Sequence, residues 1–138
     1  MSLRSIVPGM NESEVRQAAG APTEAARRAD GSGLWWYIQG PQGFTTWRVE
    51  FGRDARVRVA MQVLTEANFS RIVPGTATRD KVLDMLGRPR GRANYPNLGE
   101  EVLTWRYQDG TFNKYLNVHF GTDGVVLRCV LEMEQTDP

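Results

Sequence analysis

Cysteine and histidine are the scarcest reactive residues of this chain, with Cys129 and His119 as single copies among 138 residues. One cysteine excludes an internal disulfide and any cysteine-rich metal site, and one histidine excludes nearly every zinc site and Cys–His catalytic arrangement. No apolar run approaches the roughly 20 residues that a membrane-spanning helix needs. A charge excess is missing as well, because 17 basic residues stand against 16 acidic ones. We therefore expect no nucleic-acid partner, no metal and no other cofactor, and a protein that binds without catalysing.

What the chain does contain is an internal repeat. The tetrapeptide Ile-Val-Pro-Gly occurs at residues 6–9 and again at 72–75, and the agreement continues in order. The later matches are Val15 with Val82, Gly20 with Gly87, Pro22 with Pro89, Trp35 with Trp105, Tyr37 with Tyr107, and Val49, Phe51, Gly52, Asp54 and Val57 with Val118, Phe120, Gly121, Asp123 and Val126. Colinear matches of this kind indicate two structural copies. We place them at residues 1–64 and 65–138, with the first helix of the first copy shortened.

Each copy begins with helical signals. An apolar stripe over residues 3–7, and over 69–73 after the N-cap candidate Thr65, predicts a first short helix. Asn11 and Thr78 are expected to cap a second helix, with Glu14 at capping-box spacing from Asn11. The glycines at 20 and 87 are expected to end these second helices in the left-handed conformation.

After the helices, the hydrophobic period changes to two residues. Alternation and glycine-containing turns predict three strands in each copy. The predicted strands are 34–38, 46–51 and 57–64 in the first copy, and 103–108, 115–120 and 125–133 in the second. The sequence thus predicts an α+β fold of two tandem helix-helix-strand-strand-strand repeats, with helices on one face of an antiparallel sheet.

The repeated motif is Pro-Gly-x-(x)-Thr/Asn-x-x-x-Val-x-x-x-x-Gly-x-Pro, followed by Trp-x-Tyr and Val-x-Phe-Gly-x-Asp. It resembles the SmpA/OmlA (BamE-like) family of small bacterial outer-membrane lipoproteins, and two such units in tandem are similar to the β-lactamase inhibitor proteins (BLIP-like). The resemblance implies a non-catalytic periplasmic binding or scaffold protein that serves outer-membrane assembly or maintenance. Its expected partners are envelope proteins, including the outer-membrane assembly machinery. An enzyme inhibitor of the β-lactamase-inhibitor type is the alternative.

A lipoprotein carries its lipid on an N-terminal cysteine, which this sequence lacks. We expect Met1-Ser2-Leu3 to be a cloning remnant, and a leader with the lipid-bearing cysteine to precede it. Anchoring to the outer membrane would then depend on that upstream segment.

The polar face of the predicted sheets is the candidate site. Strand alternation places on it aromatic and arginine side chains among polar ones, a composition typical of interfaces. The candidate partner-binding residues are Trp36, Arg48, Glu50, Arg106, Tyr115, Asn117 and His119, with Thr46 beside them. The alternative is a solvated face with its charges paired across strands. For Trp36 the two possibilities are an exposed anchor for a partner and a contact at the rim between the two copies.

Other residues admit simpler interpretations. The aromatic residues 35, 37, 105 and 107 are expected to pack in the core, and Cys129 as a small buried apolar residue. The basic loop 88–92 either meets lipid phosphates or an acidic protein, or is solvated. The loops 28–33, 40–43 and 95–101 are further candidates for recognition. An enzyme would have to use Asp54, Asp123 or Glu50 as acid or base, but aspartate in a turn is expected for turn chemistry alone.

Overall fold

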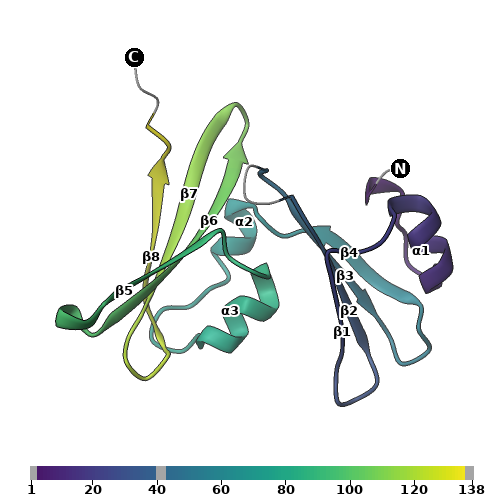
Figure 1. Cartoon of the computed structure of the whole chain (residues 1–138), viewed down its shortest axis with the longest axis horizontal. Coiled ribbons are helices and arrows are strands. Elements are labelled where there is room, and N and C mark those ends of the chain that lie inside the picture. Colours follow the sequence, from purple (N-terminus) through teal and green to yellow (C-terminus); the bar gives the residue numbers. More distant parts are fainter. Residues whose placement is uncertain (1–2, 40–42, 136–138) are drawn as a thin grey trace. The chain divides into compact units, whose positions relative to one another are not determined.

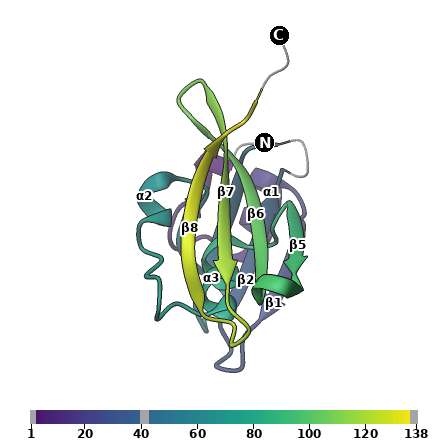
Figure 2. The ribbon, with the colours of Figure 1, turned by 90° about the vertical axis from the view of Figure 1, so that its left-hand side faces the viewer.

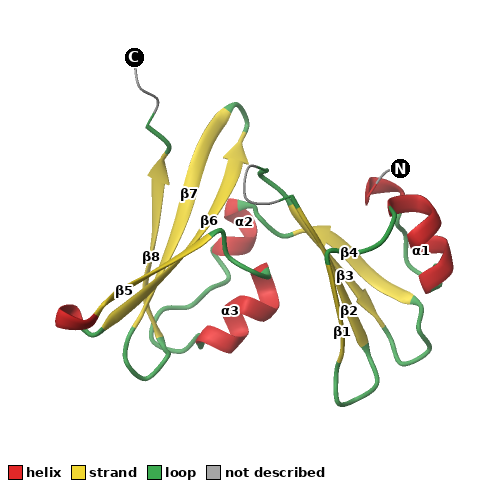
Figure 3. Cartoon of the chain, viewed as in Figure 1, coloured by secondary structure: helices red, strands yellow, loops and turns green. Residues whose placement is uncertain are grey.

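The computed structural model describes residues 3–39 and 43–135, and strands dominate it (Figures 1 and 3). The chain forms two compact units. The first comprises Met1–Ile38 and Thr46–Gln62, and the second comprises Gln39–Thr45 and Val63–Pro138. The predicted division at residues 64 and 65 stays a prediction.

The first unit contains a 3-10 turn, one helix and four strands, in the order η1 (Leu3–Ser5), α1 (Glu12–Ala19), β1 (Glu24–Arg27), β2 (Gly33–Ile38), β3 (Thr46–Phe51) and β4 (Val57–Gln62). The second contains two helices, a 3-10 turn and four strands, in the order α2 (Glu66–Phe69), α3 (Arg79–Leu86), β5 (Gly91–Tyr95), η2 (Pro96–Leu98), β6 (Glu100–Asp109), β7 (Phe112–Phe120) and β8 (Val126–Met133). None of these described helices is long and apolar enough to cross a membrane.

The predicted α+β class is wrong, because the protein is mostly β. Strands hold 45% of the residues and helices 20%, and the strands form two antiparallel sheets, β1-β2-β3-β4 and β5-β6-β7-β8. Two strands were missed. β1 has four residues, and β5 contains glycine and asparagine, which are depleted in strands. Each pairs along its whole length with the next strand of the chain, so backbone pairing overrides weak propensity.

The first predicted helix of each copy is also shorter than expected. Residues 3–7 form only the three-residue turn η1, and α2 ends at Phe69, before Ile72 and Val73. The predicted caps, in contrast, are confirmed. Asn11 accepts from Glu14 N–H in a complete capping box, and Thr65 and Thr78 each accept a backbone N–H three residues on.

The glycines that end α1 and α3 adopt a conformation that differs from the predicted one. Gly20 has φ 80° and ψ −171°, and Gly87 has φ 76° and ψ −165°. This combination of positive φ and extended ψ is essentially restricted to glycine. The glycine requirement was therefore correct, but the left-handed helical conformation was not.

The β-hairpin turn between the last two strands of each sheet offers a matched test of backbone strain. Ala55 has φ 60°, and Gly124 has φ 77° at the equivalent place. Both donate to the carbonyl of a glycine three residues earlier at 3.0 Å. A left-handed conformation costs a residue with a Cβ atom about 1 kcal/mol more than it costs glycine.

We expect Ala55→Gly to raise the free energy of unfolding by about 0.5–1 kcal/mol and Gly124→Ala to lower it by a similar amount. A Cβ atom at residue 124 would meet no atom within 4 Å, so the change isolates backbone strain from steric clash. Urea denaturation of both variants measures the effect. Changes of the same sign would contradict it.

The core of the first unit forms where α1 and the residues before it pack against the sheet. Val15 of α1 and Ile6 pack with side chains of β2, β3 and β4, and the rings of Trp35 and Phe51 meet edge to face at 4.7 Å between centroids. The guanidinium of Arg16 lies 4.8 Å from the centroid of Trp35. The predicted core role of the aromatic residues is confirmed, since Trp35, Tyr37, Trp105 and Tyr107 are all buried.

The sheet registers correct one detail of the repeat. A bulge follows Glu50 in β3 and His119 in β7, so these two residues occupy equivalent positions. When the pairing is counted from them, the residue of β2 that is equivalent to Trp105 of β6 is Tyr37, not Trp35. Hydrogen bonds agree, because Tyr37 Oη donates to Gly20 O at 2.8 Å and Trp105 Nε1 to Gly87 O at 3.2 Å. The sequence alignment of these aromatic residues was therefore shifted by two residues. A shift of two keeps each side chain on the same face of its sheet.

Candidate partner-binding face

One face of the second sheet is hollowed. β5, β6, β7 and β8 lie side by side, with β5 and β8 at the two edges (Figure 2). The hollow on this sheet has a volume of about 410 Å³. It is lined by side chains of all four strands and of η2, namely Ala93, Tyr95, Leu98, Glu100, Val102, Thr104, Asn117, His119, Arg128, Val130 and Glu132.

The floor of the hollow follows from the strand register. Thr104 of β6 lies opposite Asn117 of β7, which in turn lies opposite Val130 of β8. The Thr104 hydroxyl donates to Asn117 Oδ1 at 2.7 Å. Val102 lies two residues along the same face and is buried. The floor therefore combines a fixed polar pair with the small apolar side chain of Val102.

Three charged or titratable groups meet at one end of the hollow. Glu100 Oε1 accepts a hydrogen bond from Arg128 Nη2 at 2.8 Å and lies 3.0 Å from His119 Nδ1. His119 Nδ1 also lies 3.2 Å from Arg128 Nη2. A proton on Nδ1 lets the ring donate to Glu100, whereas its absence lets the ring accept from Arg128. The side chain of Glu100 is 13% exposed, so this network is a partly desolvated feature of the wall.

Apolar side chains form the rim. Tyr95 is 49% exposed and Leu98 is 69% exposed, and both lie where β5 passes through η2 toward β6. Val130 adds an exposed apolar side chain on β8. Apolar side chains around a few fixed polar groups are able to receive a chain segment that carries both kinds of group.

Two of the predicted binding residues, Asn117 and His119, lie in this hollow. Two others lie one row further along the strands. Arg106 Nη2 donates to both carboxylate oxygens of Glu134 at 3.0 and 2.9 Å, and Tyr115 Oη lies 3.4 Å from Glu134 Oε1. The hydrogen bond from Arg106 holds the pKa of Glu134 below its ordinary value.

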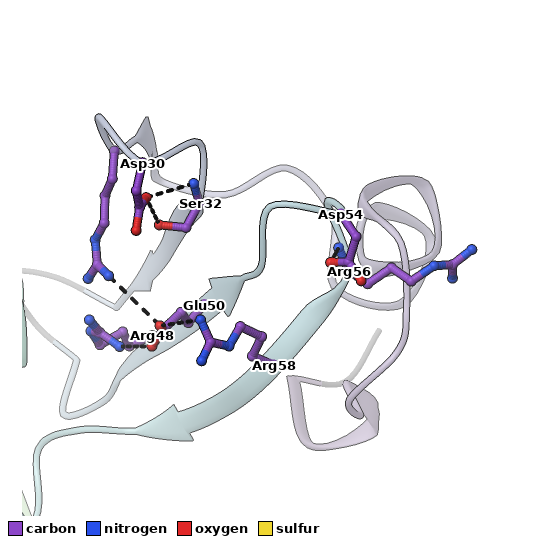
Figure 4. Close-up of polar contacts among 8 residues, drawn as sticks. Asp30, Ser32, Arg48, Glu50, Asp54, Arg56 and Arg58 are labelled. Carbon is purple, nitrogen blue, oxygen red and sulfur yellow. Dashed lines mark hydrogen bonds and ion pairs between the residues drawn. The ribbon is translucent and has the colours of Figure 1, made fainter.

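The remaining predicted residues belong to the first unit. Trp36 is 7% exposed, which does not fit the exposed anchor that was one of the two possibilities for this side chain. The guanidinium of Arg48 lies 5.7 Å from the centroid of Trp36. Glu50 makes ion pairs with Arg48 at 3.1 Å and with Arg58 at 3.9 Å (Figure 4), and with Arg28 at 3.8 Å. Thr46, beside them, is buried.

Equivalent positions of the two sheets differ in side-chain size. The registers match Trp36 with Thr104 and Arg48 with Asn117. On the second sheet, the smaller threonine and asparagine therefore stand where the first sheet carries tryptophan and arginine. This difference in volume explains why the second sheet has its hollow at these positions.

A wider hollow of about 620 Å³ lies over the turns of the first unit and is lined by Asp30, Ser32, Gly52, Arg53, Asp54 and Arg58. Asp30 Oδ1 accepts from the Ser32 hydroxyl at 2.6 Å and from its N–H at 2.9 Å (Figure 4). The hydroxyl contact is the main reason that the pKa of Asp30 is lowered. Asp54 and Asp123 each accept the backbone N–H two residues on, at 3.1 Å, which is turn chemistry.

The arginines of the basic loop 88–92 contact neighbouring side chains of the second unit. Arg92 makes an ion pair with Glu101 at 2.6 Å, and the guanidinium of Arg90 lies 5.3 Å from the centroid of Tyr115. Of the loop at 40–43, residues 40–42 lie outside the described residues. The loops at 28–33 and 95–101 are described, and the second supplies Tyr95, Leu98 and Glu100 to the hollow of the second sheet.

Six lining residues were not identified from the sequence, whereas Tyr95, Leu98 and Glu100 belong to the loop 95–101 that is named above as a candidate for recognition. Ala93 lies in β5, which was not predicted, and Val102 lies just before the predicted strand 103–108. The other four are Thr104, Arg128, Val130 and Glu132. Their alternation was visible within predicted strands, so the signal was present, but it did not distinguish these positions from an ordinary solvated face.

No family model, curated protein or solved structure matches this chain. The resemblance to the SmpA/OmlA family and to the β-lactamase inhibitor architecture therefore stays a prediction from the motifs.

Proposed function

We propose that this chain is a non-catalytic binding protein that holds a segment of a partner protein in the hollow of its second sheet. The observation that carries the proposal is the hollow itself, about 410 Å³ in volume, with apolar side chains at its rim and a fixed polar pair on its floor. This volume falls in the range of ordinary binding pockets and accommodates a few side chains.

The lining determines the kind of segment that fits. Tyr95, Leu98 and Val130 offer apolar contact area at the rim. The charges of the lining are mixed, because Arg128 is paired with Glu100 and Glu132 adds a further carboxylate, so the lining selects no single sign of ligand charge. We therefore propose a segment with one or two apolar side chains and with backbone groups that reach the polar floor.

The first sheet suggests a variant that fills the hollow. Thr104→Trp places on the second sheet the side chain that the equivalent position of the first sheet already carries. We expect the variant to fold and to lose at least about tenfold in partner affinity. Thr111→Trp, in the exposed β6–β7 turn, is the matched control and should bind normally.

Photo-crosslinking in the cells that make this chain measures the effect. A photoreactive residue at Ala93 or Leu98 should yield the same partner adduct, and Thr104→Trp should abolish both adducts. A photoreactive residue at Lys81, on α3, should yield neither. Adducts that persist in Thr104→Trp, or that form equally from Lys81, would refute the proposal.

The cell-envelope setting, the lipid anchor, the role in outer-membrane assembly and the alternative role as an enzyme inhibitor stay predictions. They depend on the motif resemblance alone. The identity of the crosslinked partner would test them directly, because an envelope protein, an assembly factor and an enzyme are distinguishable by mass spectrometry.

A further inference from the structure

Among the residues that the structure describes, only the beginning of β8 has a hydrogen-bonded neighbour on its outer edge. β8 ends the second sheet on one side (Figure 2). Val126 makes two backbone hydrogen bonds with the segment at 75–77: Gly75 N–H donates to Val126 O, and Val126 N–H donates to Ala77 O, both at 2.8 Å. Beyond Val126, the strand continues for seven residues.

The backbone of this second part of β8 has outward hydrogen-bonding groups. Glu134 N–H donates to Asn113 O of β7 at 2.9 Å. Backbone direction alternates along a strand, so residues 132, 130 and 128 also face β7. The N–H and C=O groups of Cys129, Leu131 and Met133 then point away from the sheet. Within residues 3–39 and 43–135, no backbone or side-chain partner is found for them.

The side chains of the same strand leave an apolar strip at this edge. Leu127, Leu131 and Met133 are each nearly half exposed, and the half-buried Cys129 lies between them. Natural sheets protect such edges with proline, with charged side chains, lysine above all, or with a covering segment. β8 contains neither proline nor lysine, and its two charged residues, Arg128 and Glu132, carry opposite signs. An uncovered apolar edge of this kind is a template for pairing with another strand.

The geometry points to a two-fold dimer in which β8 pairs antiparallel with β8 of a second copy. The pairing is centred on Val130. It places Cys129 opposite Leu131 of the second copy, so that their outward backbone groups bond to each other. It also places Leu127 opposite Met133, which covers the apolar strip. The partner strand is the strand itself, as a closed two-fold interface requires.

Charge complementarity selects this register. Centred on Val130, the pairing sets Arg128 of each copy opposite Glu132 of the other, and opposite charges at such positions stabilise a sheet. A register centred on Cys129 sets Arg128 opposite Val130. One centred on Leu131 sets it opposite Glu134, whose carboxylate already binds Arg106. Arg128 is 51% exposed, which leaves N–H groups for a second carboxylate.

Disulfide crosslinking tests the register. Directly opposed residues that are not hydrogen-bonded have Cα atoms about 4.5 Å apart, within disulfide range. Val130→Cys in a Cys129→Ala background should therefore form a covalent dimer on oxidation. Glu132→Cys in the same background is the control, because its counterpart would lie about 13 Å along the strand. Absence of crosslinking at residue 130, or equal crosslinking at both positions, would overturn the proposal.

Sedimentation equilibrium of the purified chain tests the dimer itself, without any partner protein. The wild-type chain should approach twice its 15.5 kDa mass as its concentration rises. Leu131→Lys should raise the dimer dissociation constant at least about tenfold, because it adds a charge to the paired edge. Phe112→Lys, an exposed apolar residue outside β8, should leave it unchanged. A wild-type monomer at all concentrations, or a dimer insensitive to Leu131→Lys, would overturn the proposal and leave the partner-binding hollow untouched.

Discussion

Replacing Trp105 with alanine is expected to lower the free energy of unfolding of the second unit by about 3–5 kcal/mol. Trp105 is 1% exposed and lies opposite Leu116 on the central pair of strands. Its Nε1 also donates to Gly87 O, which ties β6 to the end of α3. The substitution removes the largest buried side chain of the unit together with that hydrogen bond. A domain of ordinary stability would lose a large share of its free energy of unfolding.

Two other variants separate the contributions at this position. Trp105→Phe keeps most of the apolar ring but loses the donor to Gly87, and should cost less than Trp105→Ala. Trp47→Ala removes a partly buried tryptophan from the first unit and should also cost less. Chemical denaturation followed by circular dichroism measures all three. Equal losses for Trp47→Ala and Trp105→Ala would contradict the central place of Trp105 in its core.

Acid is expected to destabilise the second unit strongly below about pH 4.5. The pKa values of Glu66, Glu101 and Glu134 are each lowered from 4.5 in the folded chain. The largest cause in each case is a side-chain hydrogen bond, from Tyr107 to Glu66, from Arg79 to Glu101 and from Arg106 to Glu134.

The sign follows from proton binding. A lowered pKa in the folded state means that the unfolded chain binds more protons as the pH falls through this range. The stability contributed by these carboxylates is therefore fully present above about pH 4.5, and is lost as the pH falls through their folded pKa values. The double variant Glu66→Gln/Glu101→Gln should be less stable at neutral pH, but should lose less stability on acidification. Urea denaturation at about pH 7 and about pH 3 measures both. An identical loss in the wild type and the double variant would contradict the assignment.

The features that local chemistry determines were predictable from the sequence. The caps at Asn11 and Thr78, the glycines after α1 and α3, and the hairpin turns depend on side-chain or backbone groups within a few residues. The class of the fold was not, because β1 and β5 are edge strands held by pairing with β2 and β6. Short sequences with low strand propensity take this conformation when a neighbouring strand supplies the hydrogen bonds.

The candidate site was predictable only in part. Alternation placed Asn117 and His119 on the face of β7 that carries the hollow, but it did not show that Trp36 on the first sheet is buried. The distinction between the two sheets depends on volume at paired positions, threonine and asparagine in the second where tryptophan and arginine stand in the first. Pairing registers, which a single sequence does not show, are needed to make that comparison.

Hydrogen–deuterium exchange on the complex with the photo-captured partner tests most directly whether the second sheet's hollow is the binding face. If it is, residues 93–104 and 115–120 should exchange more slowly in the complex, and no such slowing should occur when Thr104→Trp is mixed with the same partner. Protection confined to the first unit, or unchanged by Thr104→Trp, would contradict it.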